Sequence, residues 1–161
     1  MVMQIRLPSP AEMHAVNSMG FDVWGNGDTH KEFLAACRHS PRFHGGTWYV
    51  LDKHGVLVSS LLVHRLPLTA VVETIATAPD HREQGYASVL LETVMDQLNK
   101  EGISRIFLYA EKRSTAYRRL GFEELPKRFQ TRKHFTCYLR APHVSVLLNS
   151  PDFHPPKLEH K

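Results

Sequence analysis

The residues best suited to chemistry lie where a strand-like segment gives way to a helical one, at positions 81–88. Residues 71–78 are rich in β-branched side chains and are closed by Pro79, which predicts a strand followed by a turn. After Gly85 the apolar residues recur at helical spacing, and Gly102 stands where a C-cap is expected. The first backbone N–H groups of such a helix have no internal partner, and its dipole adds roughly half a positive charge. The junction is therefore suited to bind a phosphate anion.

Two motifs of this region resemble those of a known family. The segment from Arg82 to Ala87 has the pattern Arg-x-x-Gly-x-Ala, with a proline three residues before the arginine. This pattern resembles the cofactor-binding signature of the GNAT superfamily of N-acetyltransferases. Tyr117, followed by Gly121 and Phe122, is similar to the Tyr-x-x-x-Gly-Phe motif of the same family. Both motifs at the expected separation are far rarer by chance than either alone.

The resemblance implies acetyl-CoA as co-substrate. Its phosphates are expected to bind the backbone N–H groups of the glycine turn, and its pantetheine arm is expected to pair with the preceding strand as an added strand would. The residues expected to bind the cofactor are Ile75, Ala76, Thr77, Arg82, Glu83, Gln84, Gly85, Tyr86, Ala87 and Ser88.

Two side chains are candidates for proton transfer during acyl transfer to an amine. An aliphatic amine has a pKa of about 10.4, so at neutral pH a group must accept its proton. Glu73 is the candidate base, because it shares a strand face with Ile75 and Thr77, and the resemblance implies that this face points toward the acceptor. A solvated carboxylate is the alternative, and the family often places its glutamate at the position of Val71. Tyr117 is the candidate acid for the departing thiolate, since a phenol with a pKa of about 10 is protonated at neutral pH. A core tyrosine is the alternative for Tyr117.

The elements that must position these groups follow an order typical of one α+β domain. Strands are expected at 3–7, 47–51, 56–63, 71–78, 103–110, 122–125 and 134–140, and helices are expected to begin near Pro10, Thr29, Gly85 and Ser114. The strands at 71–78 and 103–110 are joined by a helix, so they should run parallel. The resemblance implies the GNAT fold, a central mixed and mostly antiparallel sheet flanked by helices, with these two strands splayed around the cofactor.

Length and composition predict one soluble domain. The 161 residues can bury a core of their own. We expect a GNAT domain over 1–140 and an extension over 141–161 with one short element and a loosely ordered tail. A hydrophobic content of 42% and a charged content of 22% exclude disordered and fibrous classes. Because there is no apolar leader and no apolar run of about 18 residues, a cytoplasmic location is expected and no membrane association.

Other classes of partner have weak support. Cys37 and Cys137 lack Cys-x-x-Cys spacing and are expected to be free, buried thiols. The eleven histidines are scattered without metal-ligand spacing, so no metal site is expected. The net charge of +4 comes with basic clusters that resemble a nucleic-acid footprint. Positively charged side chains are also expected near the phosphates of coenzyme A. We expect no nucleic-acid partner, and a monomer or homodimer.

The identity of the amine acceptor stays open. The resemblance implies that the acceptor approaches over the first two helices and the strand ends, a region that here offers Asp22, Trp24, Asp28 and His30. A protein lysine, an N-terminal amine, a polyamine, an amino acid and an aminoglycoside all remain candidates. A CoA-binding module without catalysis and an enzyme that uses a longer acyl-CoA are the alternatives to acetyl transfer.

Overall fold

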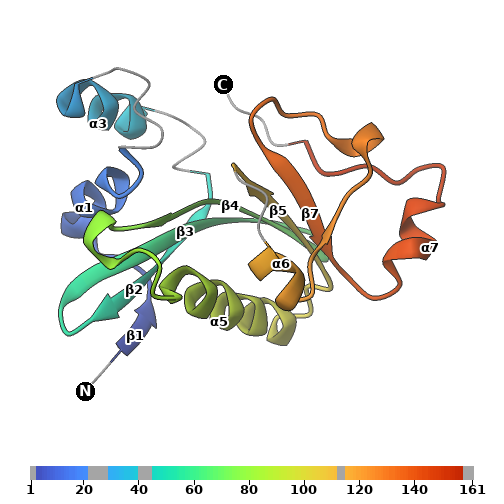
Figure 1. Cartoon of the computed structure of the whole chain (residues 1–161), viewed down its shortest axis with the longest axis horizontal. Helices are drawn as coiled ribbons and strands as arrows, with labels where there is room; N and C mark the ends of the chain where they lie inside the picture. The colour runs from blue at the N-terminus through green and yellow to red at the C-terminus, as the bar shows by residue number, and fades with distance from the viewer. Residues whose placement is uncertain (1–2, 22–28, 40–44, 112–114, 158–161) are drawn as a thin grey trace.

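A computed structural model describes residues 3–21, 29–39, 45–111 and 115–157 (Figure 1). Within these residues the strands form one seven-stranded sheet in the order β1-β2-β3-β4-β5-β7-β6. The strands are β1 (Met3–Arg6), β2 (Thr47–Lys53), β3 (Val56–Leu66), β4 (Thr69–Thr77), β5 (Arg105–Ala110), β6 (Glu123–Glu124) and β7 (Thr136–Arg140). The helices are α1 (Met13–Ser18), α3 (His30–His39), α5 (Tyr86–Lys100), α6 (Thr115–Arg119) and α7 (Val144–Leu148), with short 3₁₀ turns at Pro10–Glu12, Pro79–His81 and Lys127–Phe129.

The pairing of the strands confirms the predicted α+β class. All neighbouring strands are antiparallel except β4 and β5, which run parallel on either side of the α5 crossover. The β2–β3 hairpin turns at His54 and Gly55, whose φ angles of 55° and 85° are both positive. Glycine adopts such a conformation without strain, as its position in the turn predicted.

The first helices begin with capping boxes. Ser9 N–H donates to Glu12 Oε1 at 2.8 Å, and the matching pair before α3 joins Thr29 and Glu32 in both directions at 3.2 and 3.1 Å. Arg6 of β1 also binds Glu12, with Nη1 2.8 Å from Oε1. These bonds lower the pKa of Glu12 to about 2. The start of the chain is thereby tied to the sheet.

The helices cover both faces of the sheet (Figure 1). On one face α5 packs over β2, β3 and β4, and its buried side chains Leu90, Leu91, Val94, Met95 and Leu98 form the main core with inward residues of the strands. On the other face α1 and α3 cover β2 to β4, whereas α7 and the segment after it lie over β5 and β7. Cys37 and Cys137 are buried thiols that are not in a disulfide, as predicted.

The segment after β7 packs against β5 and β7, on the face of the sheet opposite to α5. Phe153 stacks on Phe107 of β5 with ring centres 6.1 Å apart, and it meets Phe129 edge-on at 5.2 Å. A domain boundary at residue 140 remains a prediction. No helix in the described part of the chain is long and apolar enough to cross a membrane.

Candidate active site

The N-terminus of α5 is opened by Gly85. Gly85 is the N-cap residue with a φ of 81°, and its carbonyl accepts the first helical hydrogen bond from Val89 N–H at 3.1 Å. The N–H groups of Tyr86, Ala87 and Ser88 precede that bond and therefore have no helical acceptor. They point along the helix axis toward the end of β4, where the dipole favours an anion.

The turn before the helix is fixed to the sheet by Arg82. Its Nε–H donates to the carbonyl of Thr77, the last residue of β4, at 3.0 Å. Glu83 has a positive φ of 64°, and Glu83 and Gln84 are exposed. Arg82 thus holds the turn at the end of β4 through this hydrogen bond.

The C-terminal half of β4, residues 75–77, pairs with a strand on one side only. The parallel pairing with β5 ends at Val72 and Leu108, and beyond that point the two strands separate (Figure 1). Ala76 and Thr77 pair with β3 on their other side. Residues 75–77 therefore form an edge that does not pair with β5, along which the carbonyls of Ala76 and Thr77 already accept hydrogen bonds from Ser59 and Arg82.

A β-bulge at Thr74 divides β4. Opposite it, the two steps from Ser60 to Leu62 on β3 span three steps from Ala76 to Glu73 on β4. Thr74 has a φ of 57°, which is a conformational outlier for a β-branched residue. The extra residue reverses the alternation of side chains between the two halves of the strand.

The bulge overturns one expectation about Glu73. Ile75 packs against the core beneath α5, and Thr77 Oγ1 lies 3.3 Å from Ser59 Oγ on that face. Glu73 lies on the opposite face, beside His64. The prediction that Glu73 shares a face with Ile75 and Thr77 is wrong, because it assumed a regular strand.

Glu73 sits in a buried ion cluster. Its side chain is fully buried, and Arg132 Nη1 donates to Oε2 at 2.9 Å while His64 Nε2 lies 3.3 Å from Oε1. The guanidinium of Arg132 lies over the rings of Tyr109 and Phe135, at 4.4 and 4.7 Å from their centres. The cation stabilises the carboxylate form of Glu73.

Tyr117 is held on α6 against the sheet. Its ring packs on that of Tyr138 of β7, with centres 5.3 Å apart, and its carbonyl accepts the Phe122 N–H at 3.0 Å. Burial, and next the Tyr138 hydroxyl, raise the pKa of Tyr117 above its ordinary value of 10.0. The phenol is therefore protonated at neutral pH. The predicted cap residue Ser114 lies outside the described residues.

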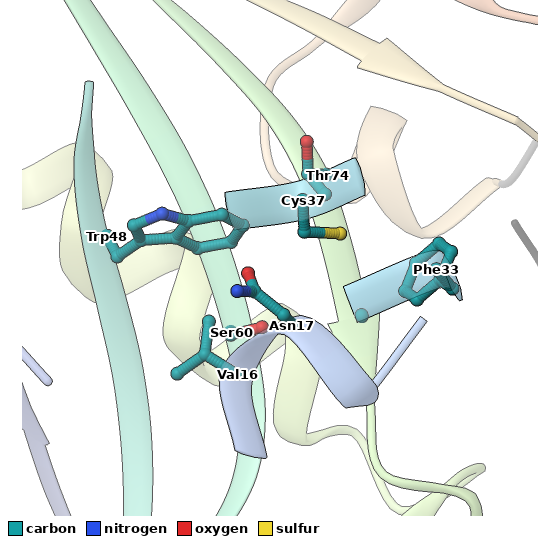
Figure 2. A pocket seen from close by; sticks show the side chains of 8 residues that line it. Val16, Asn17, Phe33, Cys37, Trp48, Ser60 and Thr74 are labelled. Carbon is teal, nitrogen blue, oxygen red and sulfur yellow. The ribbon is translucent and has the colours of Figure 1, made fainter. Parts of the chain in front are cut away.

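A small pocket lies under α1 and α3 (Figure 2). Its lining comes from two helices and three strands: Val16, Asn17, Phe33, Cys37, Trp48, Ser60, Thr74 and Ala76. Thr74 and Ala76 bring the bulge and the C-terminal half of β4 to this pocket. The predicted acceptor residues Asp22, Trp24 and Asp28 lie outside the described residues, and His30 instead bonds Ser18 Oγ at 2.9 Å.

The family assignment rests on the sequence. The chain matches the model of the acetyltransferase (GNAT) family over residues 13–122. This chain belongs to the GNAT family. The match contains both motifs and extends over the N-terminal helices, which the motifs alone did not reach. By sequence, no curated protein matches the chain.

Solved GNAT structures share this fold. The PaiA N-acetyltransferase of Thermoplasma acidophilum, solved with coenzyme A, aligns with a TM-score of 0.67 at 12% identity over 88% of this chain and 100% of its own. The ribosomal-protein-S18-alanine N-acetyltransferase of Escherichia coli aligns at 0.66 and 18% identity, over 86% and 93% of the two chains. A GNAT family acetyltransferase of Brucella melitensis, solved with acetyl-CoA, aligns at 0.59 and 18% identity, over 88% and 90%.

The glycine turn of this GNAT domain is not crowded by other residues. A Cβ built on Gly85 would meet no atom within 4 Å. The N–H groups of residues 86–88 and the positive end of the helix dipole lie next to this turn. The residues that sequence reasoning missed lie on the other face. Arg132 was seen only as part of a basic cluster, and the sole signal for Ser60 was a pair of serines inside an apolar strand.

Proposed function

We propose that this GNAT-family protein transfers the acetyl group of acetyl-CoA to a primary amine. The observation that carries the proposal is the glycine-opened N-terminus of α5 beside the unpaired edge of β4. In this proposal the N–H groups of residues 86–88 bind the pyrophosphate, Arg82 and residues 83–85 shape the turn, and residues 75–77 pair with the pantetheine arm. Two aligned structures of the same fold were solved with coenzyme A or acetyl-CoA, which supports this cofactor.

Acetyl-CoA would supply a thioester carbonyl that a neutral amine can attack. The amine nitrogen forms a bond to the acetyl carbon, the carbon–sulfur bond breaks, and the amine loses one proton. Glu73 is proposed to accept that proton through water, because its carboxyl group lies beside the β4 bulge and next to His64. Its burial supports an indirect route rather than direct contact with the amine.

Tyr117 is proposed to protonate the departing thiolate. Its raised pKa keeps the proton on the phenol at neutral pH. A thiol has an ordinary pKa of about 8.5, so a hydrogen bond from the phenol stabilises the leaving sulfur. The packing on Tyr138 holds the ring on a rigid element.

A titration and a turnover assay test the proposal. Isothermal calorimetry should show binding of acetyl-CoA, and a thiol-release assay with a panel of primary amines should show turnover above the hydrolysis rate. Longer acyl-CoAs in competition identify the preferred acyl group. Absence of heat and of any thermal shift with acetyl-CoA would refute cofactor binding, whereas binding without turnover by any amine would favour a non-catalytic module.

A further inference from the structure

The pocket under α1 and α3 gathers all the buried, unpartnered side-chain oxygens found in the described residues. These are Asn17 Oδ1, Ser60 Oγ and Thr74 Oγ1, and all three residues line the same pocket (Figure 2). Ser60 is 1% exposed and Thr74 is 8% exposed. A buried polar atom without a partner destabilises the folded protein. Three such atoms, on residues that line one pocket, indicate that the pocket binds a hydrogen-bonding group.

Thr74 adds an independent observation. Its backbone has a φ of 57°, and a β-branched residue in that region is strained. Such strain concentrates where function requires a particular geometry. Here it turns the Thr74 side chain into the pocket at the point where β4 stops pairing with β5.

The walls of the pocket define the chemistry of its occupant. Val16, Phe33, Trp48 and Ala76 give apolar and aromatic contacts, and no charged side chain lines the pocket in the described part of the chain. Its enclosed part is small, with room for about one water-sized group. A carboxylate or a second ammonium would lose its hydration here without gaining a counter-charge. A hydroxyl meets both requirements, since it is neutral and can donate to an unpaired oxygen.

The pocket also lies next to the part of β4 that we propose binds the pantetheine arm of acetyl-CoA. Thr74 and Ala76 line it from one face of β4, and the segment 75–77 between and after them is the proposed partner of the pantetheine arm. We infer, building on the proposed acetyl transfer, that this pocket binds a hydroxyl or a similarly small uncharged hydrogen-bonding group next to the amine of the acceptor. The preferred acceptor is thus a hydroxyl-bearing amine, and amines with a neighbouring carboxylate or a second ammonium are rejected.

Matched acceptors test this inference. One set is 2-aminoethanol, propylamine, 3-aminopropanoate and 1,2-diaminoethane, and a second set is short peptides that begin with Thr, Val, Asp or Lys. Thiol release at saturating acetyl-CoA gives kcat/KM, corrected for the neutral fraction of each amine. In the set that is turned over, we expect the hydroxyl member to exceed its methyl counterpart by about tenfold or more. An equal or better methyl or charged member would overturn the inference, as would turnover of other amines but of neither set.

Two neighbouring serines provide variants and a control. Ser60→Ala and Thr74→Val remove unpartnered oxygens, so both should abolish the hydroxyl preference. Ser59→Ala is the control, because Ser59 lies on the α5 face and already donates to the Ala76 carbonyl at 2.8 Å. It should leave the ratio between hydroxyl and methyl acceptors unchanged. Retention of the preference in both pocket variants would contradict the inference.

Thermal unfolding of the free protein separates this inference from the proposed activity. Loss of an unpartnered oxygen should raise Tm by about 2 °C or more in Ser60→Ala and Thr74→Val, whereas Ser59→Ala should lower Tm by about 2–4 °C. This result is expected even if no amine is acetylated. A fall in Tm for both pocket variants would mean that the hydroxyls already have partners, such as a resident water, and would overturn the inference without bearing on acetyl transfer.

Discussion

Replacement of Arg132 by methionine should destabilise the protein more than the loss of any exposed ion pair. The change keeps an unbranched apolar stem against Tyr109 and Phe135 but removes the guanidinium that lies 2.9 Å from Glu73. The carboxylate of Glu73 is fully buried, so bulk solvent cannot hydrate it as it would hydrate an exposed ion. His64, at 3.3 Å from the other carboxylate oxygen, remains.

Burial determines the size of this effect. Removing one partner of a buried ion pair costs about 3–5 kcal/mol, and the remaining His64 contact places the expected loss near the lower end, at about 3 kcal/mol. For a chain of this length each kcal/mol shifts Tm by about 2–4 °C, so Tm should fall by roughly 6–12 °C. The exposed pair of Arg65 and Glu101, with 31% of each side chain accessible, should contribute at most about 1 kcal/mol.

Urea and thermal denaturation of Arg132→Met and of the control Glu101→Gln measure the difference. Adding Glu73→Gln to Arg132→Met should recover part of the loss, because a neutral amide is less costly to bury than an unpaired carboxylate. If Arg132→Met loses no more stability than Glu101→Gln, then Glu73 is not the buried ion that this reasoning requires.

Three further predictions concern the cofactor turn, the acid and the N-terminal cap. Gly85→Asp should weaken acetyl-CoA binding at least 100-fold by calorimetry, because it adds a negative charge where the phosphates bind, while Gly85→Ala should weaken it less; equal affinity in Gly85→Asp and wild type would misplace the cofactor. Tyr117→Phe should lower kcat by about 10²–10⁴-fold with acetyl-CoA affinity and Tm nearly unchanged, and near-normal turnover would exclude the acid role. The pKa of Glu12 is lowered from 4.5 to about 2, so its contribution to stability is complete above pH 4.5 and is lost as the pH falls toward 2. Thermal unfolding should therefore depend less on pH across this interval in Glu12→Gln, and an unchanged pH dependence would rule out this contribution.

Local signals predicted the elements that we propose bind the cofactor. The change from a period of two to a helical period located the start of α5, and the glycine at position 85 has the positive φ that its place in the motif requires. The strand–helix–strand order predicted that β4 and β5 are parallel. These features depend on residues that are close in sequence, so the local pattern of apolar residues and glycines predicts them.

The acceptor side depends on contacts between distant segments, and the sequence could not predict it. Asn17, Ser60 and Thr74 come from three elements, and only the folded sheet brings them to one pocket. Arg132 reaches Glu73 from a loop 59 residues away. The bulge has no signature in the alternation of residues 71–78, since Thr74 is an ordinary strand residue by type. The face of Glu73 was therefore mistaken even though its strand was predicted.

The bulge at Thr74 determines where β4 can change length during evolution. Deletion of Thr74 alone would leave a regular strand with Glu73 and Ile75 still on opposite faces. A regular strand with the same number of residues would instead turn one half of β4 over, so that either a carboxylate would enter the core beneath α5 or Ile75 would leave that core. For the same reason, an alignment without gaps to a relative with a regular strand exchanges inward and outward positions over half of β4. Residue roles therefore cannot be transferred across Thr74 by counting positions.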